Sequence, residues 1–375
     1  MNTALAPVEQ LLIGDFWVLW YAKSNTYSIV TTEFKLLLDE YLVSESKTQF
    51  LNSLCFEEDK ELQNKITKKV FSYLQSCNSP YTIPTNLNSA SLDKTKRYIS
   101  KQYTFKNKTV QVNYCSELVL KTIHPSIAHY CNISKSKVDV FFDVYLKENH
   151  LHLFKNEELI SYVPKKDYHY IQGKFIMQLL CELHNKTEDD WIGSLHGSTI
   201  TDEKNSILFV GKSGKGKSTL CALLANAGLK LLADDVSPLH SKDQNIYYNP
   251  SAISIKQGAF KLLEPLVENF KNLPIVNFNK TKGDLKYLPT IKPKQNNYPC
   301  RAIILVNYKS ESETLLEPVS IKTILETIIE DSWLSPNPKH AEQFLNWLKD
   351  LELYQLTYSD TTSVIKEVSN LFKEL

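Results

Sequence analysis

The sequence predicts a mixed α/β domain that is preceded by a small winged-helix-like α+β domain. Two observations carry this prediction. Over 207–228, "ILFVGKSGKGKSTLCALLANAG", an apolar strand, a glycine-rich loop and an apolar helix follow one another, as in parallel α/β domains. Within the first 78 residues, two strands rich in aromatic and β-branched residues precede three helical segments.

The N-terminal domain is expected over 1–78. Strands are predicted at 14–21 and 26–31, and the polar turn "AKSN" between them predicts a hairpin. Helices are predicted from Thr32 onward, around 46–56, and over 58–77. The segment 79–95 is polar and contains two prolines, which predicts a linker.

The rest of the chain alternates strand-like and helical patterns. Ahead of the glycine-rich loop, the predicted elements are two strands near 103–123, a meander over 138–164, a helix over 167–186, and strands at 193–200 and 206–210. Short strand-like runs follow Asp235, and the predicted C-terminal helices are 320–330, 338–352 and 361–374. We therefore expect an α/β domain over 96–310 and a helical extension over 311–375.

Composition narrows the class of protein. The chain has 42 Asp and Glu residues and 43 Lys and Arg residues, so its net charge does not indicate a nucleic-acid partner, and none is expected. The basic stretch "NKITKK" at 64–69 indicates a solvated helix face. Arginine-dependent chemistry has only two candidates, Arg97 and Arg301.

The sequence shows no cysteine motif, signal peptide or membrane-spanning stretch. The seven cysteines form no C-x-x-C pair or metal-ligand spacing, which predicts free thiols in a reducing compartment. The first residues lack a basic start and a long apolar run, and no stretch of about 18 apolar residues occurs. The expectation is a soluble cytoplasmic protein without a membrane partner.

The glycine-rich loop matches G-x-x-x-x-G-K-[ST] at every fixed position and predicts a phosphate-binding loop, or P-loop. Glycines let successive backbone N–H groups point at phosphate oxygens, and the helix N-terminus adds partial positive charge. Lys217 is expected to reach the outer phosphates, and the Ser218 hydroxyl to ligate Mg²⁺. The predicted nucleotide-binding residues are Gly211, Ser213, Gly214, Lys215, Gly216, Lys217, Ser218 and Thr219.

Two further motifs flank the loop. Asp234 and Asp235 end the strand-like run "LKLLA", seventeen residues after Lys217, where one carboxylate could hold Mg²⁺ and the other could remove a proton from a hydroxyl. His196 lies twenty-one residues before Lys217 in "GSLHGSTI". Spacing alone leaves open whether His196 is structural or faces the γ-phosphate.

Together, "LHG" (195–197), "GKSGKGKST" (211–219) and "LLADD" (231–235) resemble the catalytic domain of the HPr kinase/phosphorylase family, which is similar to the phosphoenolpyruvate carboxykinase fold. The resemblance covers roughly 125–310 and is specific over 192–239. It implies that Asp234 is the base, that Asp235 binds Mg²⁺ with Ser218, and that His196 lies near the transferred phosphate. The family also uses an arginine ahead of a later strand, for which Arg301 is the local candidate.

Departures from the family affect the expected substrate. Thr219 stands where the family has Glu, and the family's N-terminal sensor domain is not recognisable. HPr is therefore not expected as the substrate. The chain looks more like HPr-kinase-like proteins of peptide-modification systems, which phosphorylate a serine-type hydroxyl of a peptide or small molecule.

The segment 14–42 resembles a PqqD-like domain, which implies binding of a leader peptide as an added strand. An ordinary winged-helix or dimerisation module is the alternative, and the family resemblance also implies a homo-oligomer. For the whole chain we expect an ATP- and Mg²⁺-dependent phosphotransferase. The alternatives are a nucleotide-gated binding protein, a plain ATPase or a pyrophosphate-using enzyme. The sequence does not distinguish ATP from GTP, because no pattern identifies the nucleobase.

Overall fold

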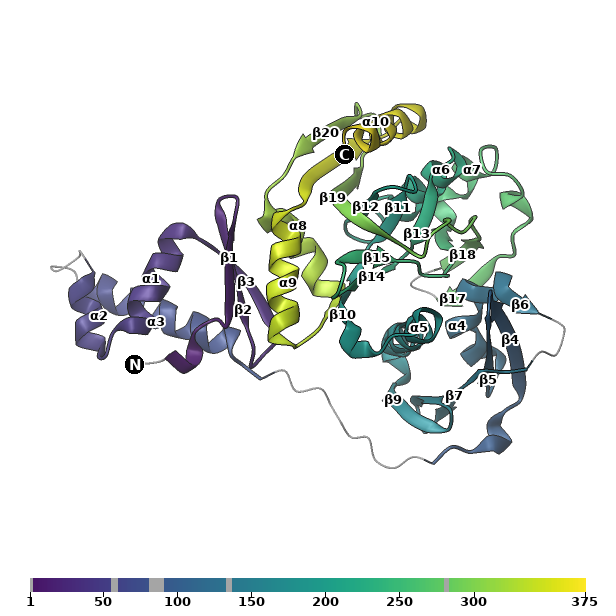
Figure 1. Ribbon diagram of the computed structural model, residues 1–375, viewed down its shortest axis with the longest axis horizontal. Helices are drawn as coiled ribbons and strands as arrows, with labels where there is room; N and C mark the ends of the chain where they lie inside the picture. The colour runs from purple at the N-terminus through teal and green to yellow at the C-terminus, as the bar shows by residue number, and fades with distance from the viewer. Residues whose placement is uncertain (1–2, 55–59, 81–90, 133–136, 280–282) are drawn as a thin grey trace.

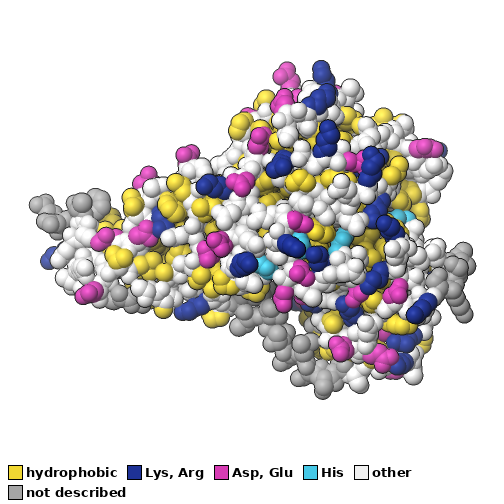
Figure 2. All heavy atoms as spheres, in the orientation of Figure 1, with side chains coloured by type: hydrophobic (Ala, Val, Ile, Leu, Met, Phe, Trp, Pro, Cys, Tyr) yellow, Lys and Arg dark blue, Asp and Glu magenta, His cyan; other side chains and the backbone are white. Residues whose placement is uncertain are grey.

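The computed structural model describes residues 3–54, 60–80, 91–132, 137–279 and 283–375 (Figure 1). Within these ranges the chain forms a mixed α/β structure with four β-sheets, in agreement with the predicted class. None of the helices in these ranges combines the length and hydropathy that a membrane crossing needs. On the face drawn in Figure 2, basic and acidic side chains are interspersed.

The N-terminal part is a three-stranded antiparallel sheet followed by three helices. Its elements are β1 (Glu9–Ile13), β2 (Phe16–Tyr21), β3 (Thr26–Thr31), α1 (Thr32–Val43), α2 (Lys47–Ser53) and α3 (Lys60–Cys77). Strand β1 was not predicted, and the strand predicted to begin at Gly14 begins at Phe16. Gly14 and Asp15 instead form a two-residue turn, in which Gly14 has φ +57° and Ile13 pairs with Phe16.

Strand β2 is buried on both faces, which explains its continuous apolar run. Leu19 and Tyr21 point into a core shared with α1–α3. Val18 and Trp20 point to the other face, where they join the core around α8 (Ile321–Ile328) and α9 (Pro338–Lys349). Figure 1 shows α8 and α9 between this small sheet and the rest of the molecule.

A six-stranded sheet in the order β6-β4-β5-β7-β8-β9 follows, with α4 and α5 packed on it. The elements are β4 (Ile99–Phe105), β5 (Lys108–Tyr114), α4 (Glu117–Ile127), β6 (Cys131–Asn132), β7 (Val140–Lys147), β8 (His150–Lys155), β9 (Glu158–Pro164) and α5 (Tyr168–His184). The meander and the helix over 167–186 were predicted close to these bounds. The strand expected to reach 123 was wrong beyond Tyr114, because Ser116 caps a new helix by accepting the Val119 N–H at 3.3 Å.

The largest sheet has ten strands. Its order is β13-β11-β12-β19-β15-β14-β10-β21, and β22 pairs with β19 and β20. These strands are β10 (Trp191–His196), β11 (Ser198–Thr201), β12 (Ser206–Val210), β13 (Lys230–Ala233), β14 (Val236–His240), β15 (Asn245–Tyr247), β19 (Asn297–Tyr308), β20 (Leu315–Pro318), β21 (Trp333–Leu334) and β22 (Glu352–Tyr358). Strands β12, β19 and β22 are parallel neighbours, so their carboxyl-terminal ends meet at one edge.

Helices cover both faces of this sheet. One face packs against α6 (Lys217–Asn226), α7 (Phe260–Leu263) and α10 (Thr361–Glu374). The other face packs against α8 and α9. A small sheet of β16 (Ile253–Lys256), β18 (Gly283–Leu288) and β17 (Val276–Asn279) lies beside α6.

The segment after 310 differs from the expected helical extension. It contains the three expected helices, but also β20, β21 and β22, and β22 pairs with β19 over seven residues. The helix expected to continue to 352 ends at Lys349, and the chain re-enters the sheet. This segment is therefore part of the ten-stranded sheet. The predicted domain boundaries remain a prediction, and residues 81–90 of the expected linker lie outside the described residues.

Candidate functional site

The glycine-rich loop (211–216) joins the fully buried strand β12 to helix α6. Gly211, Gly214 and Gly216 have φ of +145°, +88° and +94°, conformations that L side chains rarely adopt. A Cβ on Gly216 would lie 2.8 Å from Tyr358 Oη and 3.1 Å from Tyr308 Cβ. The sequence therefore folds here into a tight backbone curl that ends at a helix N-terminus.

Lysines surround this loop. The Lys217 ammonium is buried and donates a hydrogen bond to the Gly211 carbonyl oxygen. Burial lowers the pKa of Lys217, while the nearby charges of Asp235 and Asp234 raise it. Lys215 Nζ donates to Asn307 Oδ1 at 3.1 Å, and Lys256 Nζ donates to Ser213 Oγ at 2.7 Å. Lys256 was not predicted, because only the tertiary fold brings it to the loop.

Asp234 follows β13 and is only 2% exposed. Its Oδ1 accepts hydrogen bonds from Ser198 Oγ at 2.6 Å and from Ser218 Oγ at 3.5 Å. Its Oδ2 accepts the Ser254 N–H at 3.0 Å. Burial, and then the charge of Asp235, raise the pKa of Asp234 to about 6, although these hydrogen bonds and Lys217 lower it. Asp234 is thus fixed in place beside Ser218 of the loop.

Asp235 lies in a different environment. Its backbone is left-handed, with φ +66°, and its side chain is 67% exposed. Asp235 Oδ1 lies 3.4 Å from His196 Nδ1. His196 ends β10, pairs with Val236 of β14, and donates its backbone N–H to Ser332 Oγ at 2.8 Å. The strand pairing therefore brings His196 and Asp235 together.

Tyr287 is a further aromatic near these carboxylates, and it was not predicted. It pairs with Ser254 across β16 and β18. Burial, and then the charges of Asp235 and Asp234, raise the pKa of its phenol. Its phenol therefore stays protonated.

The expected role of Arg301 does not fit its position. Cys300 pairs with Ser206 at the amino-terminal end of β12, and Arg301 Nε donates to Asn205 Oδ1 at 3.1 Å. Four strand residues at about 3.3 Å each, roughly 13 Å, separate that end from the loop. The structure therefore does not bring Arg301 to the site, because parallel pairing places it at the opposite end of the strand.

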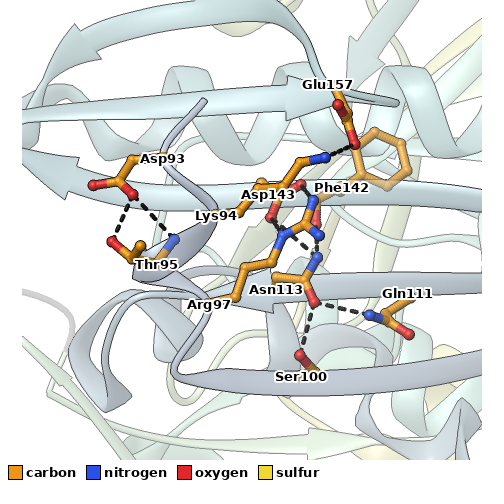
Figure 3. Close-up of polar contacts among 10 residues, drawn as sticks. All are labelled: Asp93, Lys94, Thr95, Arg97, Ser100, Gln111, Asn113, Phe142, Asp143 and Glu157. Carbon is orange, nitrogen blue, oxygen red and sulfur yellow. Dashed lines mark hydrogen bonds and ion pairs between the residues drawn. The ribbon is translucent and has the colours of Figure 1, made fainter. Parts of the chain in front are cut away.

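The other arginine, Arg97, lies just before β4 of the six-stranded sheet (Figure 3). Arg97 Nε and Nη2 donate to the two oxygens of the buried Asp143 at 2.6 and 2.8 Å. Asn113 Nδ2 donates to the same carboxylate at 3.0 Å. Arg97 therefore neutralises a buried charge, and neither arginine contributes to the loop.

The predicted Mg²⁺ pair was Ser218 with Asp235. In the structure the Ser218 hydroxyl donates to Asp234 Oδ1. Two oxygens in adjacent positions on an octahedral Mg²⁺, each bonded at about 2.1 Å, lie about 3 Å apart. The 3.5 Å between Ser218 Oγ and Asp234 Oδ1 fits one shared ion. No group of three or more His, Cys, Asp or Glu side chains suited to a metal occurs among the described residues.

Comparisons with known proteins add little to this geometry. No protein-family model matches the chain, and no curated protein matches it. Among solved structures, the HPr(Ser) kinase/phosphatase from Coxiella burnetii is similar over 48% of this chain and 97% of its own, at 12% identity and a TM-score of 0.23. The likeness is distant, and at this TM-score it carries no argument about the chemistry of this chain.

Proposed function

We propose that this protein is a Mg²⁺-dependent phosphotransferase that moves the γ-phosphoryl group of ATP to a hydroxyl of a peptide or small molecule. One observation carries the proposal. Lys217, Ser218, Asp234, Asp235 and His196 come from three segments of the chain and converge beside the glycine-rich loop. The convergence supplies a phosphate cradle, a cation site and an exposed carboxylate within one site.

The cradle rests on the loop and on Lys217. Left-handed glycines turn backbone N–H groups toward one point, and the N-terminus of α6 adds partial positive charge. The Lys217 ammonium folds back onto the Gly211 carbonyl, from which a bound phosphate oxygen would recruit it. Phosphoryl transfer depends chiefly on such positioning and charge neutralisation.

Ser218 and Asp234 would hold the Mg²⁺ ion. Asp234 is buried and orientated by Ser198 and the Ser254 N–H, which suits a fixed metal ligand. A bound Mg²⁺ would neutralise charge that develops on the transferred phosphoryl group. Ionisation of Asp234 is favoured once a cation lies beside it.

Asp235 is the better candidate for the base, which exchanges the roles implied by the family resemblance. An acceptor hydroxyl must come within hydrogen-bond reach of the base. Asp235 is 67% exposed and faces His196, whereas both oxygens of Asp234 already accept hydrogen bonds. His196 would orientate Asp235 toward the acceptor.

A nucleotide-gated binding protein is the second candidate. Asn25 of the N-terminal part donates to the Leu334 carbonyl of β21 at 2.8 Å, and β21 pairs with β10, which ends at His196. This route connects the N-terminal sheet to the site through two hydrogen-bonded strands. ATP could therefore alter partner binding there without phosphoryl transfer.

The test is transfer from γ-labelled ATP with Mg²⁺ into host lysate, separated into peptide and small-molecule fractions. We expect labelling with the wild type and with Asp15→Asn, an exposed control. Asp235→Asn should lose roughly 10²- to 10⁴-fold in transfer and retain Mg²⁺-ATP binding. Asp234→Asn should lose transfer and the Mg²⁺-dependent part of ATP binding.

Two results would redirect these assignments. If Asp235→Asn transferred phosphate at the wild-type rate, Asp235 would not be the base. ATP binding by the wild type without any labelled acceptor, together with ATP-dependent partner capture, would favour the gated binding protein.

A further inference from the structure

The carboxyl-terminal ends of β19 and β22 lie on one side of the glycine-rich loop and carry paired tyrosines. Tyr308 ends β19 and pairs with Tyr358, which ends β22. The Tyr308 N–H donates to the Lys215 carbonyl at 3.1 Å, so the end of β19 is tied to the loop itself. These two aromatic residues take no part in the proposed transfer.

The tyrosine pair is rigid and half open to solvent. Tyr358 is 2% exposed and its Oη donates to the Gly216 carbonyl at 3.3 Å. The ring centroids of Tyr308 and Tyr358 lie 5.5 Å apart at 73°, an edge-to-face contact. The Lys309 N–H donates to the Tyr358 carbonyl at 3.0 Å and links the strand ends beyond the rings. Tyr308, 44% exposed, is therefore a supported ring with a free surface beside the loop.

The sheet order decides which side of the loop a nucleoside would take. Strands β11 and β13 lie on one side of β12, and Asp234 and Asp235 follow β13 there. Strands β19 and β22 lie on the other side. If the γ-phosphate faces the carboxylates, the nucleoside must leave over β19 and β22. Ligands of open α/β sheets bind outside the carboxyl-terminal ends of the strands, which is the edge where the loop, the carboxylates and Tyr308 lie.

We infer that Tyr308 is the stacking platform for the nucleobase of the nucleotide that the loop binds. The inference rests on the proposed function and deepens it, because it favours nucleoside triphosphates over inorganic polyphosphates as the phosphate donor. Aromatic stacking accepts any base, since every base has a π-face. Tyr308 therefore provides affinity for ATP and GTP alike, and Tyr358 positions its ring.

The experiment compares two ligands that share a triphosphate group. Binding of Mg²⁺-ATP and of Mg²⁺-tripolyphosphate is measured by calorimetry for the full chain. The variants are Tyr308→Ala, Tyr308→Phe and Lys217→Ala, with Tyr98→Ala as a control at an exposed tyrosine just before β4. Thermal unfolding of each variant shows that it is folded.

We expect Tyr308→Ala to lower the affinity for Mg²⁺-ATP about tenfold, as loss of one stacked base predicts. Its affinity for Mg²⁺-tripolyphosphate should stay within about twofold of the wild-type value. Tyr308→Phe and Tyr98→Ala should bind both ligands as the wild type does, and Lys217→Ala should weaken both.

Unchanged ATP binding in Tyr308→Ala would overturn the platform and leave the proposed function standing. An equal loss of affinity for both ligands would also overturn the platform, because the ring would then only support the loop. If the wild type bound neither ligand, the proposed function itself would fail, and the platform with it.

Discussion

Asp234 and Asp235 are adjacent in the chain but lie in opposite environments. The left-handed backbone of Asp235 turns its side chain to solvent while that of Asp234 stays buried. The Val236 N–H donates to the Asp234 carbonyl at 2.8 Å and closes this turn. A pair that looks equivalent in sequence is therefore divided between a fixed ligand position and an accessible one.

The burial of Asp234 predicts a pH-dependent stability. Its pKa is about 6 in the folded protein against an ordinary value of 3.8, so between pH 4 and 6 the folded protein binds more protons than the unfolded chain. The free energy of unfolding therefore falls as pH rises through this window, by roughly 3 kcal/mol for this group. Asp234→Asn removes the effect.

Urea unfolding without metal or nucleotide is the measurement. At pH 8, Asp234→Asn should be more stable than the wild type by about 1–3 kcal/mol, and the difference should shrink toward pH 4. Asp15→Asn, at an exposed carboxylate, is the matched control. A less stable Asp234→Asn at pH 8 would mean that Lys217 stabilises the ionised carboxylate by more than burial costs.

At the scale of elements, the loop and α6 are held by the strand ends behind them. Gly216 has φ +94° and faces Tyr358 Oη, whereas Gly214 has φ +88° and faces open space. An alanine at Gly214 meets only the backbone cost, about 1–2 kcal/mol. An alanine at Gly216 adds a contact at 2.8 Å, so we expect it to lower the free energy of unfolding by roughly a further 1 kcal/mol or more.

The two glycine variants are compared by denaturant unfolding and by Mg²⁺-ATP binding. Gly258→Ala is the control, because neither a positive φ nor a close contact occurs there. Equal stability of Gly214→Ala and Gly216→Ala would contradict the proposed packing of the loop against Tyr358.

Local patterns predicted the elements whose residues decide their own conformation. The strand–loop–helix unit around Lys217 followed from fixed glycines and an apolar run, and the meander and α5 followed from periodicity. Strand β22 was missed because "LELYQLTY" directly follows the helix α9 and shows its strand character only when paired with β19.

The residues of the candidate site also fall into two groups: those that a local motif predicts and those that only the tertiary fold brings together. The motif residues of the loop, the acid pair and His196 were all found in sequence, and the structure brings them together. Ser198, Ser254 and Lys256 carry no motif, and their contacts arise only from sheet pairing. Arg301 was misplaced because sequence spacing does not give the end of a parallel strand at which a residue lies.

For the whole molecule, one hydrophobic core crosses the predicted boundary between the N-terminal part and the rest. Ile13, Val18, Trp20 and Tyr27 pack in the same cluster as residues of α8, α9 and the ten-stranded sheet. The same cluster includes residues of β10 and β21, so it supports β10, which ends at His196, and the strand paired with it. We therefore expect the N-terminal part and the α/β part to unfold together.

The ring pair Tyr27–Phe344 tests this coupling, because its centroids lie 5.3 Å apart at 77° across the boundary. Phe344→Ala should lower the free energy of unfolding by about 3–5 kcal/mol. In a double-mutant cycle with Tyr27→Ala, we expect a coupling energy of about 0.5–1.5 kcal/mol. Hydrogen exchange should show that amides of β2 and of β12 lose protection together in Phe344→Ala. A coupling energy near zero, or lost protection in β2 alone, would mean that the N-terminal sheet is an independent module that docks on α9 without stabilising the sheet behind it.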